Sequence, residues 1–569
     1  MKSMKTGWLR HSLSFAVAAL VAGFVAPVWA AFELPEGEKI TNLPAIPRAI
    51  PQKEAYELYD PKIGKNFDVK NFWLRADLRV RPEFRNGVCF GSTNAAATGN
   101  CNTMSATGTT GAAAGTKGKA NDFYVQQWVR LGIGYDLSPD VNFYMEIIDS
   151  AVWGGNGGQA ETGAALSSLN HNCSTVASNG GGCQLGVRAA YVLVRNLGGV
   201  QGLSMKAGRQ YLIFGNHSLF GHFDWANTGF SHDGVMFSYE TKAVTSYLGW
   251  FREAEGDLSS GAATGSIAGN VAGQATANTG RDATNDADLF IFYNQIKSVP
   301  GFLIEPYYVL YMNNQDSSVN RAFGLGTAKH SNQIRHMVGN RIEMRKGNFD
   351  FTNELDWQFG RMGDAPAVGN AVTNLGNGAS GNQRNLSINA WATRNWIGYT
   401  HYQSAYKPRL AFNLDYASGD SKANCSLNRN AYGDCRTANT FENFYPTNHI
   451  HMGYMDVQAW KNMMSPSINF QMRPTKDDHF EIWYTNLNLA NKRDNWYRGG
   501  QNVYVFSRAD NDKSHIGDEI DLTWTRMFAD GKMAFQVTGS HLFAGGYMEK
   551  NLGTSSNQTW GYAQIWMNF

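Results

Sequence analysis

The sequence lacks any long apolar run beyond its first 30 residues, because no stretch of 18 or more apolar residues follows that point. A helix that crosses a membrane needs about 20 such residues, so the body of the chain is not a helical membrane protein. The mean hydropathy of −0.37 agrees with this. Proline is scarce, at 15 of 569 residues, whereas glycine (61) and aromatic residues (13%) are abundant. This composition favours many strands joined by glycine-bearing turns.

Motifs for nucleotide, haem and zinc-protease chemistry are also missing. The sequence has no GxxxxGK(S/T), no HExxH, no CxxCH and no GxGxxG linking a strand to a helix, so it predicts no cofactor. The chain also lacks an excess of one charge. The first 30 residues carry three basic and no acidic residues, which leaves 46 basic and 47 acidic residues after them. A nearly neutral chain argues against nucleic acid as a partner.

The first 30 residues predict a secretory signal peptide. Lys2, Lys5 and Arg10 form a positive start, and an apolar run follows from Leu13 to Val25. The sequence then offers small residues that suit cleavage after Ala30. A membrane anchor is the alternative, but the run is shorter than the about 20 residues that a spanning helix needs. We therefore expect an exported protein.

Residues 31–72 differ in character from the rest of the chain. They show no alternation of polarity, and they hold five of the 15 prolines: Pro35, Pro44, Pro47, Pro51 and Pro61. We interpret 31–72 as a periplasmic N-terminal segment that is ordered only where it touches the following domain. Residues 73–569 are then a single domain.

Within that domain, segments of about ten residues alternate between apolar and polar positions. In the segment 73–81, for example, Leu74 and Leu78 fall on one face and Arg75 and Arg79 on the other, because successive side chains of a strand point to opposite faces. A charge at every second position cannot face lipid without a large cost in free energy. One face of each strand must therefore be wet while the other faces lipid.

Eighteen such segments occur, and the connections between them alternate between short and long. Short connections carry turn residues, as at 138–140 and 346–348, whereas long ones include 84–122 and 417–464. The pattern predicts an all-β fold, a single transmembrane antiparallel β-barrel of about 18 strands in an outer membrane, with long outer loops and short periplasmic turns. The segments lie near 73–83, 123–135, 141–149, 187–195, 203–210, 233–240, 245–253, 287–296, 302–312, 333–345, 349–361, 386–400, 408–416, 465–473, 479–489, 515–527, 532–543 and 559–569.

The six cysteines form three local pairs, and all of them lie in long connections. In an exported chain, such pairs favour disulfides that close loops. A metal site is the weaker alternative, because no two cysteines form a close CxxC pair. The predicted pairs are Cys89 with Cys101, Cys173 with Cys183, and Cys425 with Cys435.

Several segments are specific enough to resemble a known family, the alginate export family of outer-membrane barrels. The resemblance implies an eighteen-stranded barrel and the passage of a polysaccharide or an anion through a charged lumen. It does not determine the substrate, since one fold serves many functions. The segments that carry the resemblance are 206–210, 214–215, 223–229, 233–235, 417–420, 445–449, 453–456 and 517–522.

Alternation assigns many charged residues to the lumen. Arginine keeps its charge and binds carboxylates with a planar fork, so an arginine stripe would attract a polyuronate or another anion. The alternative is that the arginines pair with acids and stabilise the wall. The assigned arginines are Arg75, Arg79, Arg81, Arg130, Arg335, Arg341, Arg345, Arg394 and Arg409. The assigned acids are Asp77, Glu146, Glu343, Glu354, Asp356, Asp415, Glu481, Glu519 and Asp521.

The connection from 211 to 232 is a candidate constriction loop. It contains His217, His222, Asp224, Trp225 and Asn227, and we expect it to fold into the lumen and narrow the pore. A metal site or a catalytic pair is the alternative, because His and Asp are suitable ligands. The spacing matches no compact motif, and no serine nearby lies in a recognisable nucleophile elbow. We therefore predict neither a metal nor an enzyme.

Four functions remain to be compared. The leading hypothesis is a channel that passes an anionic polysaccharide, alginate-like, or another polar anionic solute through an arginine-bearing lumen. A general or small-solute porin is the alternative. An outer-membrane enzyme and an adhesive barrel are weaker hypotheses. The enzyme needs a nucleophile with a base, and the adhesive barrel needs a pore that is closed to ions. The expected partners are outer-membrane lipid, the glycan or solute, and periplasmic export proteins.

Overall fold

The computed structural model describes residues 71–91, 120–154, 173–174, 186–226, 229–254, 287–313, 333–363, 385–423, 437–501, 503–508 and 510–568. The chain divides into two compact units, Met1–Lys39 and Ile40–Phe569. All described residues belong to the second unit.

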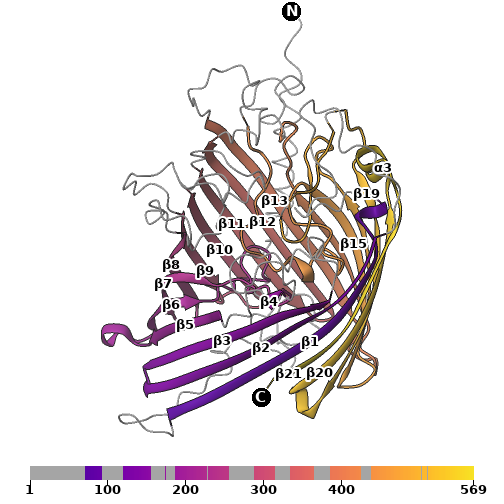
Figure 1. The fold of residues 1–569 in the computed structure, drawn as a ribbon. Coiled ribbons are helices and arrows are strands. Elements are labelled where there is room, and N and C mark those ends of the chain that lie inside the picture. Colours follow the sequence, from indigo (N-terminus) through magenta and orange to yellow (C-terminus); the bar gives the residue numbers. More distant parts are fainter. Residues whose placement is uncertain are drawn as a thin grey trace, which may run out of the picture. The chain divides into compact units, whose positions relative to one another are not determined.

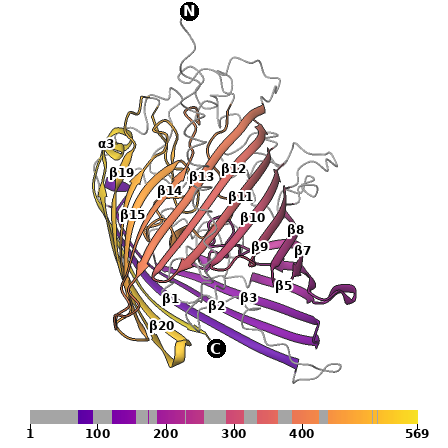
Figure 2. The same ribbon diagram turned by 180° about the vertical axis from the view of Figure 1, so that it is seen from behind.

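The second unit is a closed barrel of eighteen antiparallel strands (Figure 1 and Figure 2). Each strand pairs with its neighbours along the chain, and the first strand also pairs with the last, which closes the ring. The predicted fold class and all eighteen predicted segments are confirmed. The strands are β1 (Phe72–Val88), β2 (Ala120–Ser138), β3 (Val141–Gly154), β5 (Gly186–Val194), β6 (Leu203–Gln210), β7 (His232–Glu240), β8 (Val244–Ala254), β9 (Ala287–Ile296), β10 (Phe302–Asn313), β11 (Gln333–Lys346), β12 (Phe349–Gly363), β13 (Asn385–Thr400), β14 (Arg409–Ala417), β15 (Met463–Met472), β16 (Asp478–Asn488), β19 (His515–Phe528), β20 (Met533–Ala544) and β21 (Gln558–Asn568).

The two faces of the wall follow the sequence alternation. On β1, Leu74 is 68% exposed on the outer face, whereas Arg75 and Asp77 are buried on the inner face. On β14, Leu410 is exposed and Asn413 is buried. Apolar side chains therefore cover the outside of the barrel and polar ones its inside, as a barrel in lipid requires. Among the described residues, no helix is both long and apolar enough to cross a membrane.

The two ends of the barrel differ in the length of their connections. At one end, strands are joined by a few residues, such as 139–140 between β2 and β3 and 347–348 between β11 and β12. At the other end, the connections are long, as between β14 and β15. By the usual arrangement of outer-membrane barrels, the long connections are the outer loops.

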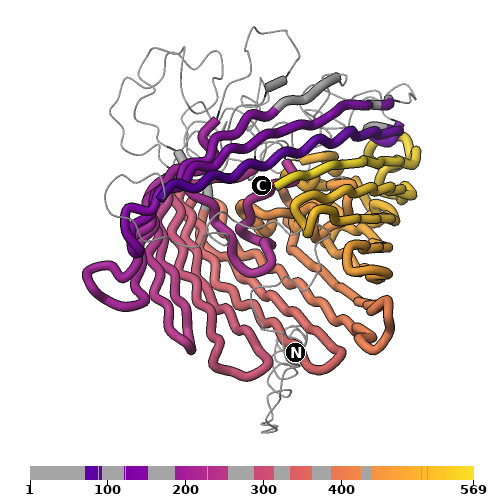
Figure 3. Tube along the Cα trace, turned by 90° about the horizontal axis from the view of Figure 1, so that it is seen from below, coloured from indigo at the N-terminus to yellow at the C-terminus, as the bar shows by residue number. Residues whose placement is uncertain are grey.

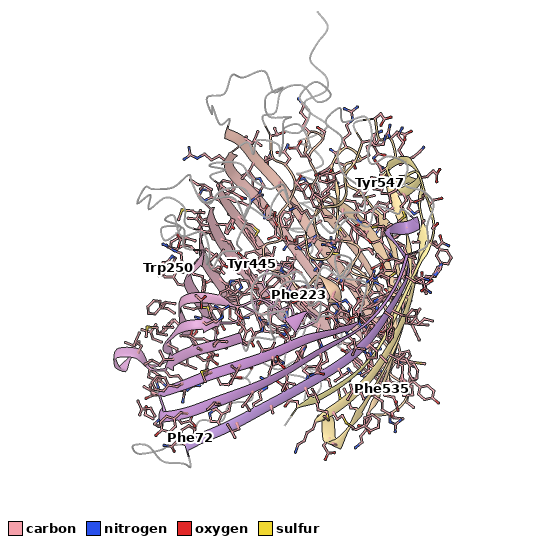
Figure 4. The ribbon with its side chains drawn as sticks, in the orientation of Figure 1. Phe72, Phe223, Trp250, Tyr445, Phe535 and Tyr547 are labelled. Carbon is pink, nitrogen blue, oxygen red and sulfur yellow. The ribbon has the colours of Figure 1, made fainter. Side chains whose placement is uncertain are left out.

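Two of the long connections lie inside the ring of strands (Figure 3). We call residues 211–231 the first inner loop and residues 437–462 the second inner loop. The two loops pair through a parallel bridge between Phe220 and Tyr445, with backbone hydrogen bonds from Gly221 to Tyr445 (2.9 Å) and from Tyr445 to Leu219 (3.0 Å). Figure 4 shows Phe223 and Tyr445 within the barrel.

Three short strands and one short α-helix in the long connections were not predicted from the sequence. They are β4 (Cys173–Ser174), β17 (Trp496–Tyr497), β18 (Val503–Val505) and α3 (Gly546–Leu552). All four are too short to give a periodic signal. They add ordered structure at the end of the barrel that carries the long loops.

Some predictions fall outside the described residues. The signal peptide (1–30) and nearly all of the segment 31–72 lie there, so both stay predictions. Cys89 is buried just after β1, and the backbone of Cys173 forms β4. The other four cysteines lie outside the described residues, so the three disulfides stay predictions as well.

Candidate functional site

All ten residues assigned to the lumen path are buried on the inner face of the wall, but they form two separate groups. Four lie on β1 and β2, and six on β11 to β14. The first group is Arg75, Asp77, Arg79 and Arg130. The second is Arg335, Arg341, Glu354, Arg394, Arg409 and Asp415.

The first group surrounds Asp224 at the tip of the first inner loop. The Asp224 carboxylate accepts hydrogen bonds from Arg130 Nη1 (2.8 Å) and Arg188 Nη2 (3.1 Å). Its backbone carbonyl accepts a third from Arg79 Nη1 (2.5 Å). Three arginines from β1, β2 and β5 therefore hold one acidic residue of the loop, and the loop is fixed to this side of the wall.

The charges around Asp224 determine its protonation. Burial alone would raise the pKa of this carboxyl group, but Arg130, His222 and Arg188 outweigh burial and hold the pKa well below its usual range. Asp224 is therefore ionised at neutral pH. An ionised carboxylate forms stronger hydrogen bonds with guanidinium groups than a neutral acid does.

Trp225, the next residue, lies in a stack of aromatic and cationic groups. The Arg81 guanidinium lies 3.4 Å from the centre of the indole ring, and the His449 ring lies 3.6 Å away, almost parallel to it. His449 Nδ1 also contacts Asp456 Oδ2 at 2.9 Å. Burial lowers the pKa of His449 despite Asp456. The stack joins the wall, the first inner loop and the second inner loop.

The second group is paired in a similar way. Arg394 contacts Asp415 at 3.1 Å and donates to Ser218 Oγ of the first inner loop at 2.7 Å. Arg341 pairs with Glu305 and with Glu343. Arg409 donates two hydrogen bonds to Asp350, and Arg335 donates to Gln358. Each of these arginines thus has an acidic or polar partner in the wall or the loop.

Some guanidinium atoms on β1 and β2 nevertheless remain without a partner. Arg75 Nε, Arg81 Nη2 and Arg130 Nε are buried and have no hydrogen-bond partner in the described part of the chain. Arg75 pairs with Asp77 through another nitrogen (2.9 Å). In the second group, Arg341 Nε and Arg409 Nη1 are likewise buried without a hydrogen-bond partner among the described residues. Both parts of the wall therefore retain N–H donors beyond those that their ion pairs use.

The histidines of the first inner loop form no recognisable metal site. The rings of His217 and His222 lie 5.1 Å apart, edge to face. Among the described residues, no group of three or more His, Cys, Asp or Glu is arranged to hold a metal ion. Asn227 lies outside the described residues. The described residues of the loop lie inside the ring of strands (Figure 3), and its role as a constriction stays a prediction.

Two functional features escaped the sequence analysis. Arg188 was not assigned to the lumen, because a register shift between β3 and β5 at Glu146 turns it inward against simple alternation. Gly229, with a φ of 62°, packs so closely on Arg188 that a Cβ atom would collide with the guanidinium. The inward position of the second inner loop was not predicted, and its contact with the first loop links residues more than 200 positions apart.

The comparisons with known proteins agree with this geometry. A family model described as alginate export matches residues 183–562, which is more than half of the chain. The chain belongs to the alginate export family. This family and the closed barrel with an apolar outer face make the protein an outer-membrane channel, and they are the family and fold of transport channels rather than of enzymes.

Two solved structures are among those to which this chain is similar at low sequence identity. OccAB2 of Acinetobacter baumannii has a TM-score of 0.48 at 10% identity, and the match covers 87% of this chain and 98% of that one. OccK11 (OpdR) of Pseudomonas aeruginosa has a TM-score of 0.43 at 10% identity, covering 87% and 96%. No curated protein matches the sequence.

Proposed function

We propose that this channel passes an anionic polysaccharide of the alginate type, or another polar anionic solute, along the arginines of β1 and β2. The observation that carries the proposal is the set of buried N–H donors without a partner on Arg75, Arg81 and Arg130. Carboxylate oxygens are acceptors only, and guanidinium groups bind them with charge-assisted hydrogen bonds.

The balance of buried charge also supports a solute path along β1 and β2. Around β1 to β6 and the first inner loop, basic residues outnumber acidic ones, and the opposite holds on β12 to β19. The first region buries Arg75, Arg79, Arg81, Arg85, Arg130, Arg188 and Lys206 against Asp77, Glu83, Asp136, Glu146 and Asp224. The strands β12 to β19 bury Glu354, Asp356, Asp415, Asp478, Glu481, Glu519 and Asp521 against Arg394 and Arg409. A local excess of one sign raises the local concentration of the opposite ion.

In this proposal, the first inner loop is the constriction. It is held by Arg79, Arg130 and Arg188 on one side and by Arg394 on the other. A loop tied to both walls narrows the lumen, so a solute must pass close to the wall. That placement brings the solute within reach of Arg75.

The test is ion selectivity in planar bilayers. We expect Arg75→Gln to lower the anion-to-cation permeability ratio by about twofold, because it removes one charge from a narrow, weakly screened path. The matched control is Arg209→Gln, which removes an arginine from the outer face of β6, where it pairs with Asp233. The control should leave the reversal potential unchanged. Equal effects of the two substitutions would contradict the role of Arg75.

The second measurement is block by an oligo-uronate. The proposal predicts that the oligosaccharide interrupts the current of the wild-type channel and does so more briefly in the Arg75→Gln variant. An unselective channel that the oligo-uronate does not block would make the protein a general porin.

We also propose that the three cysteine pairs close outer loops. Peptide mass spectrometry of the unreduced protein should find the Cys89–Cys101, Cys173–Cys183 and Cys425–Cys435 links. Free thiols at these positions would contradict the pairing.

A further inference from the structure

A patch on the inner face of β14, β15 and β16 contains buried oxygen atoms that have no hydrogen-bond partner. Every one belongs to an uncharged side chain that is at most 3% exposed. Within the described part of the chain, they lack a donor of any kind. The atoms are Asn413 Oδ1, Ser465 Oγ, Asn469 Oδ1, Gln471 Oε1 and Thr485 Oγ1.

These five residues are neighbours in the sheet. Asn413 and Thr485 both lie opposite Ser467, from the two adjacent strands. Ser465, Asn469 and Gln471 share the inner face of β15 with Ser467. Strands are spaced about 4.8 Å apart, so the five residues form one continuous patch. We call it the acceptor patch.

The chemistry of the patch differs from that of the arginines. Its unpartnered atoms are three amide oxygens, which only accept, and two hydroxyl oxygens, which accept and donate. The amide oxygens need a ligand that supplies hydrogen-bond donors, and a carboxylate or ionised phosphate group cannot do this, because its oxygens only accept. A hydroxyl group can donate to one of these oxygens and accept from a neighbouring O–H or N–H. The patch therefore suits a polyol better than an anion.

A cation fits the patch less well than hydroxyl groups do. Two carboxylates border the patch, and both already have partners. Glu481 accepts hydrogen bonds from Asn469 Nδ2 (2.6 Å), Gln471 Nε2 (3.0 Å) and the Tyr454 hydroxyl (2.6 Å). Asp415, opposite Ser465 on β14, pairs with Arg394 at 3.1 Å. The patch atoms themselves are neutral amide and hydroxyl oxygens, whereas buried cations need charged partners.

Aromatic rings border the patch. Trp483 lies opposite Asn469 on β16, and its ring packs edge to face on Trp396 of β13 at 5.8 Å. The Trp483 Nε1 donor is also buried without a hydrogen-bond partner in the described part. An indole ring offers an apolar face beside a polar N–H, and a sugar ring likewise has an apolar C–H face and a hydroxyl edge.

We propose that the acceptor patch binds the hydroxyl groups of a saccharide, on a different part of the wall from the arginines that face its carboxylates. The proposal rests on the proposed function and adds a second recognition surface to it. The second inner loop borders the patch, since Tyr454 contacts Glu481, and the Met455 N–H donates to Glu519 Oε1 at 2.9 Å.

The experiment uses the full mature channel in bilayers and a neutral probe, the carboxyl-reduced form of the oligo-uronate. The variant is Ser465→Ala with Thr485→Val, which removes two hydroxyls that have no protein partner. The control is Thr523→Val with Thr538→Val. It removes two hydroxyls from β19 and β20 that hydrogen-bond to each other at 2.9 Å. Both doubles delete the same groups from buried positions on the inner face.

We expect the neutral probe to block the wild-type channel and to dissociate about tenfold more readily from the Ser465→Ala/Thr485→Val variant, since two hydrogen bonds are lost. The control should bind it as the wild type does, and conductance in salt alone should be unchanged in both. Equal affinity in all three channels would show that only water contacts these oxygens and would overturn the proposal. If the charged oligo-uronate still blocks while the neutral one does not, the acceptor patch is rejected and the proposed function stands. If neither blocks, the proposed function fails.

Discussion

Two parts of the inner wall have the same alternating sequence pattern, but their inward side chains have different partners. On β1, β2 and β5, the inward arginines grip the first inner loop, chiefly through Asp224. On β14 to β16, the inward amides and hydroxyls leave five oxygens without a donor among the described residues. The polarity pattern alone therefore does not tell which inward side chains hold a loop and which do not. That depends on whether a loop residue lies against them.

The energetics of the two regions differ accordingly. A buried ion pair loses several kcal/mol when one partner is removed, because the other charge is left uncompensated. A buried oxygen without a donor already costs about 1–3 kcal/mol, so removing it should cost little or even stabilise the fold. Substitutions in the arginine region should thus lower the free energy of unfolding, whereas substitutions in the acceptor patch should leave it unchanged or raise it.

The largest effect should come from Asp224→Asn. The substitution removes the carboxylate that pairs with Arg188 and one of the three carboxylates that pair with Arg130, and we expect the first inner loop to lose about 3 kcal/mol of its stability against opening. Native-state proteolysis within residues 211–226 would measure this loss. The control is Asp233→Asn, which removes the exposed carboxylate from a pair of similar length with Arg209 and should cost less than about 1 kcal/mol. Equal rates of proteolysis in the two variants would show that Asp224 does not hold the first inner loop to the wall.

A somewhat smaller loss is expected for Trp225→Leu. It removes the ring that stacks between Arg81 and His449, and we expect a loss of about 2–3 kcal/mol from packing and cation–π interaction. Urea unfolding of the refolded barrel would report it. Trp250→Leu is the control, because Trp250 lies on the outer face and is 42% exposed. If this control loses as much stability, the stack does not hold the loops together.

The pH dependence should differ between two loop carboxyl groups. Burial raises the pKa of Asp494 to about 6, above the unfolded value of about 3.9. Its stabilising contribution is complete below about pH 4 and is lost as the pH rises through 6. The contribution of Asp224, whose pKa is lowered, is present above about pH 4 and is lost only at more acidic pH.

Radical footprinting at pH 4.5 and 7.5 would check this difference. We expect residues 489–501 to be better protected at pH 4.5, by about 2 kcal/mol, and residues 211–226 to be equally protected at both. Parallel changes in the two segments would show that neither carboxyl group controls its own loop.

The smallest effect, and the one of opposite sign, is expected in the acceptor patch. Thr485→Val removes a hydroxyl without a partner and should leave the free energy of unfolding unchanged or raise it by up to about 1 kcal/mol. Thr523→Val breaks the hydrogen bond to Thr538 and should lower it by about 1 kcal/mol. Thermal or urea unfolding of the two variants, compared side by side, gives the sign. A clear loss of stability in Thr485→Val would mean that its hydroxyl has a structural partner.

The strands of the barrel wall could be predicted from the sequence because the pattern that indicates them is local. A period of two places Arg75, Asp77 and Arg79 on one face without any tertiary information. The same rule fails at Arg188, where a bulge next to Glu146 shifts the register, because a bulge inserts one residue into one strand of a pair.

The site could be predicted only in part, since it depends on distant contacts. The sequence indicated that residues 211–232 fold inward, but nothing local shows that Tyr445 pairs with Phe220. The acceptor patch was invisible for the same reason. Whether Thr485 or Thr523 has a free hydroxyl depends on which residue lies opposite, and both occupy equivalent inward positions in their strands.

The most direct test of the difference between the two wall regions crosses two probes with two variants in single-channel recordings. The probes are an oligo-uronate and its carboxyl-reduced neutral form, and the variants are Arg75→Gln and Ser465→Ala/Thr485→Val. The account predicts that Arg75→Gln shortens block by the charged probe only, whereas the double variant shortens block by both. If both variants affect both probes equally, the two regions do not read different groups of the ligand, and the account is wrong.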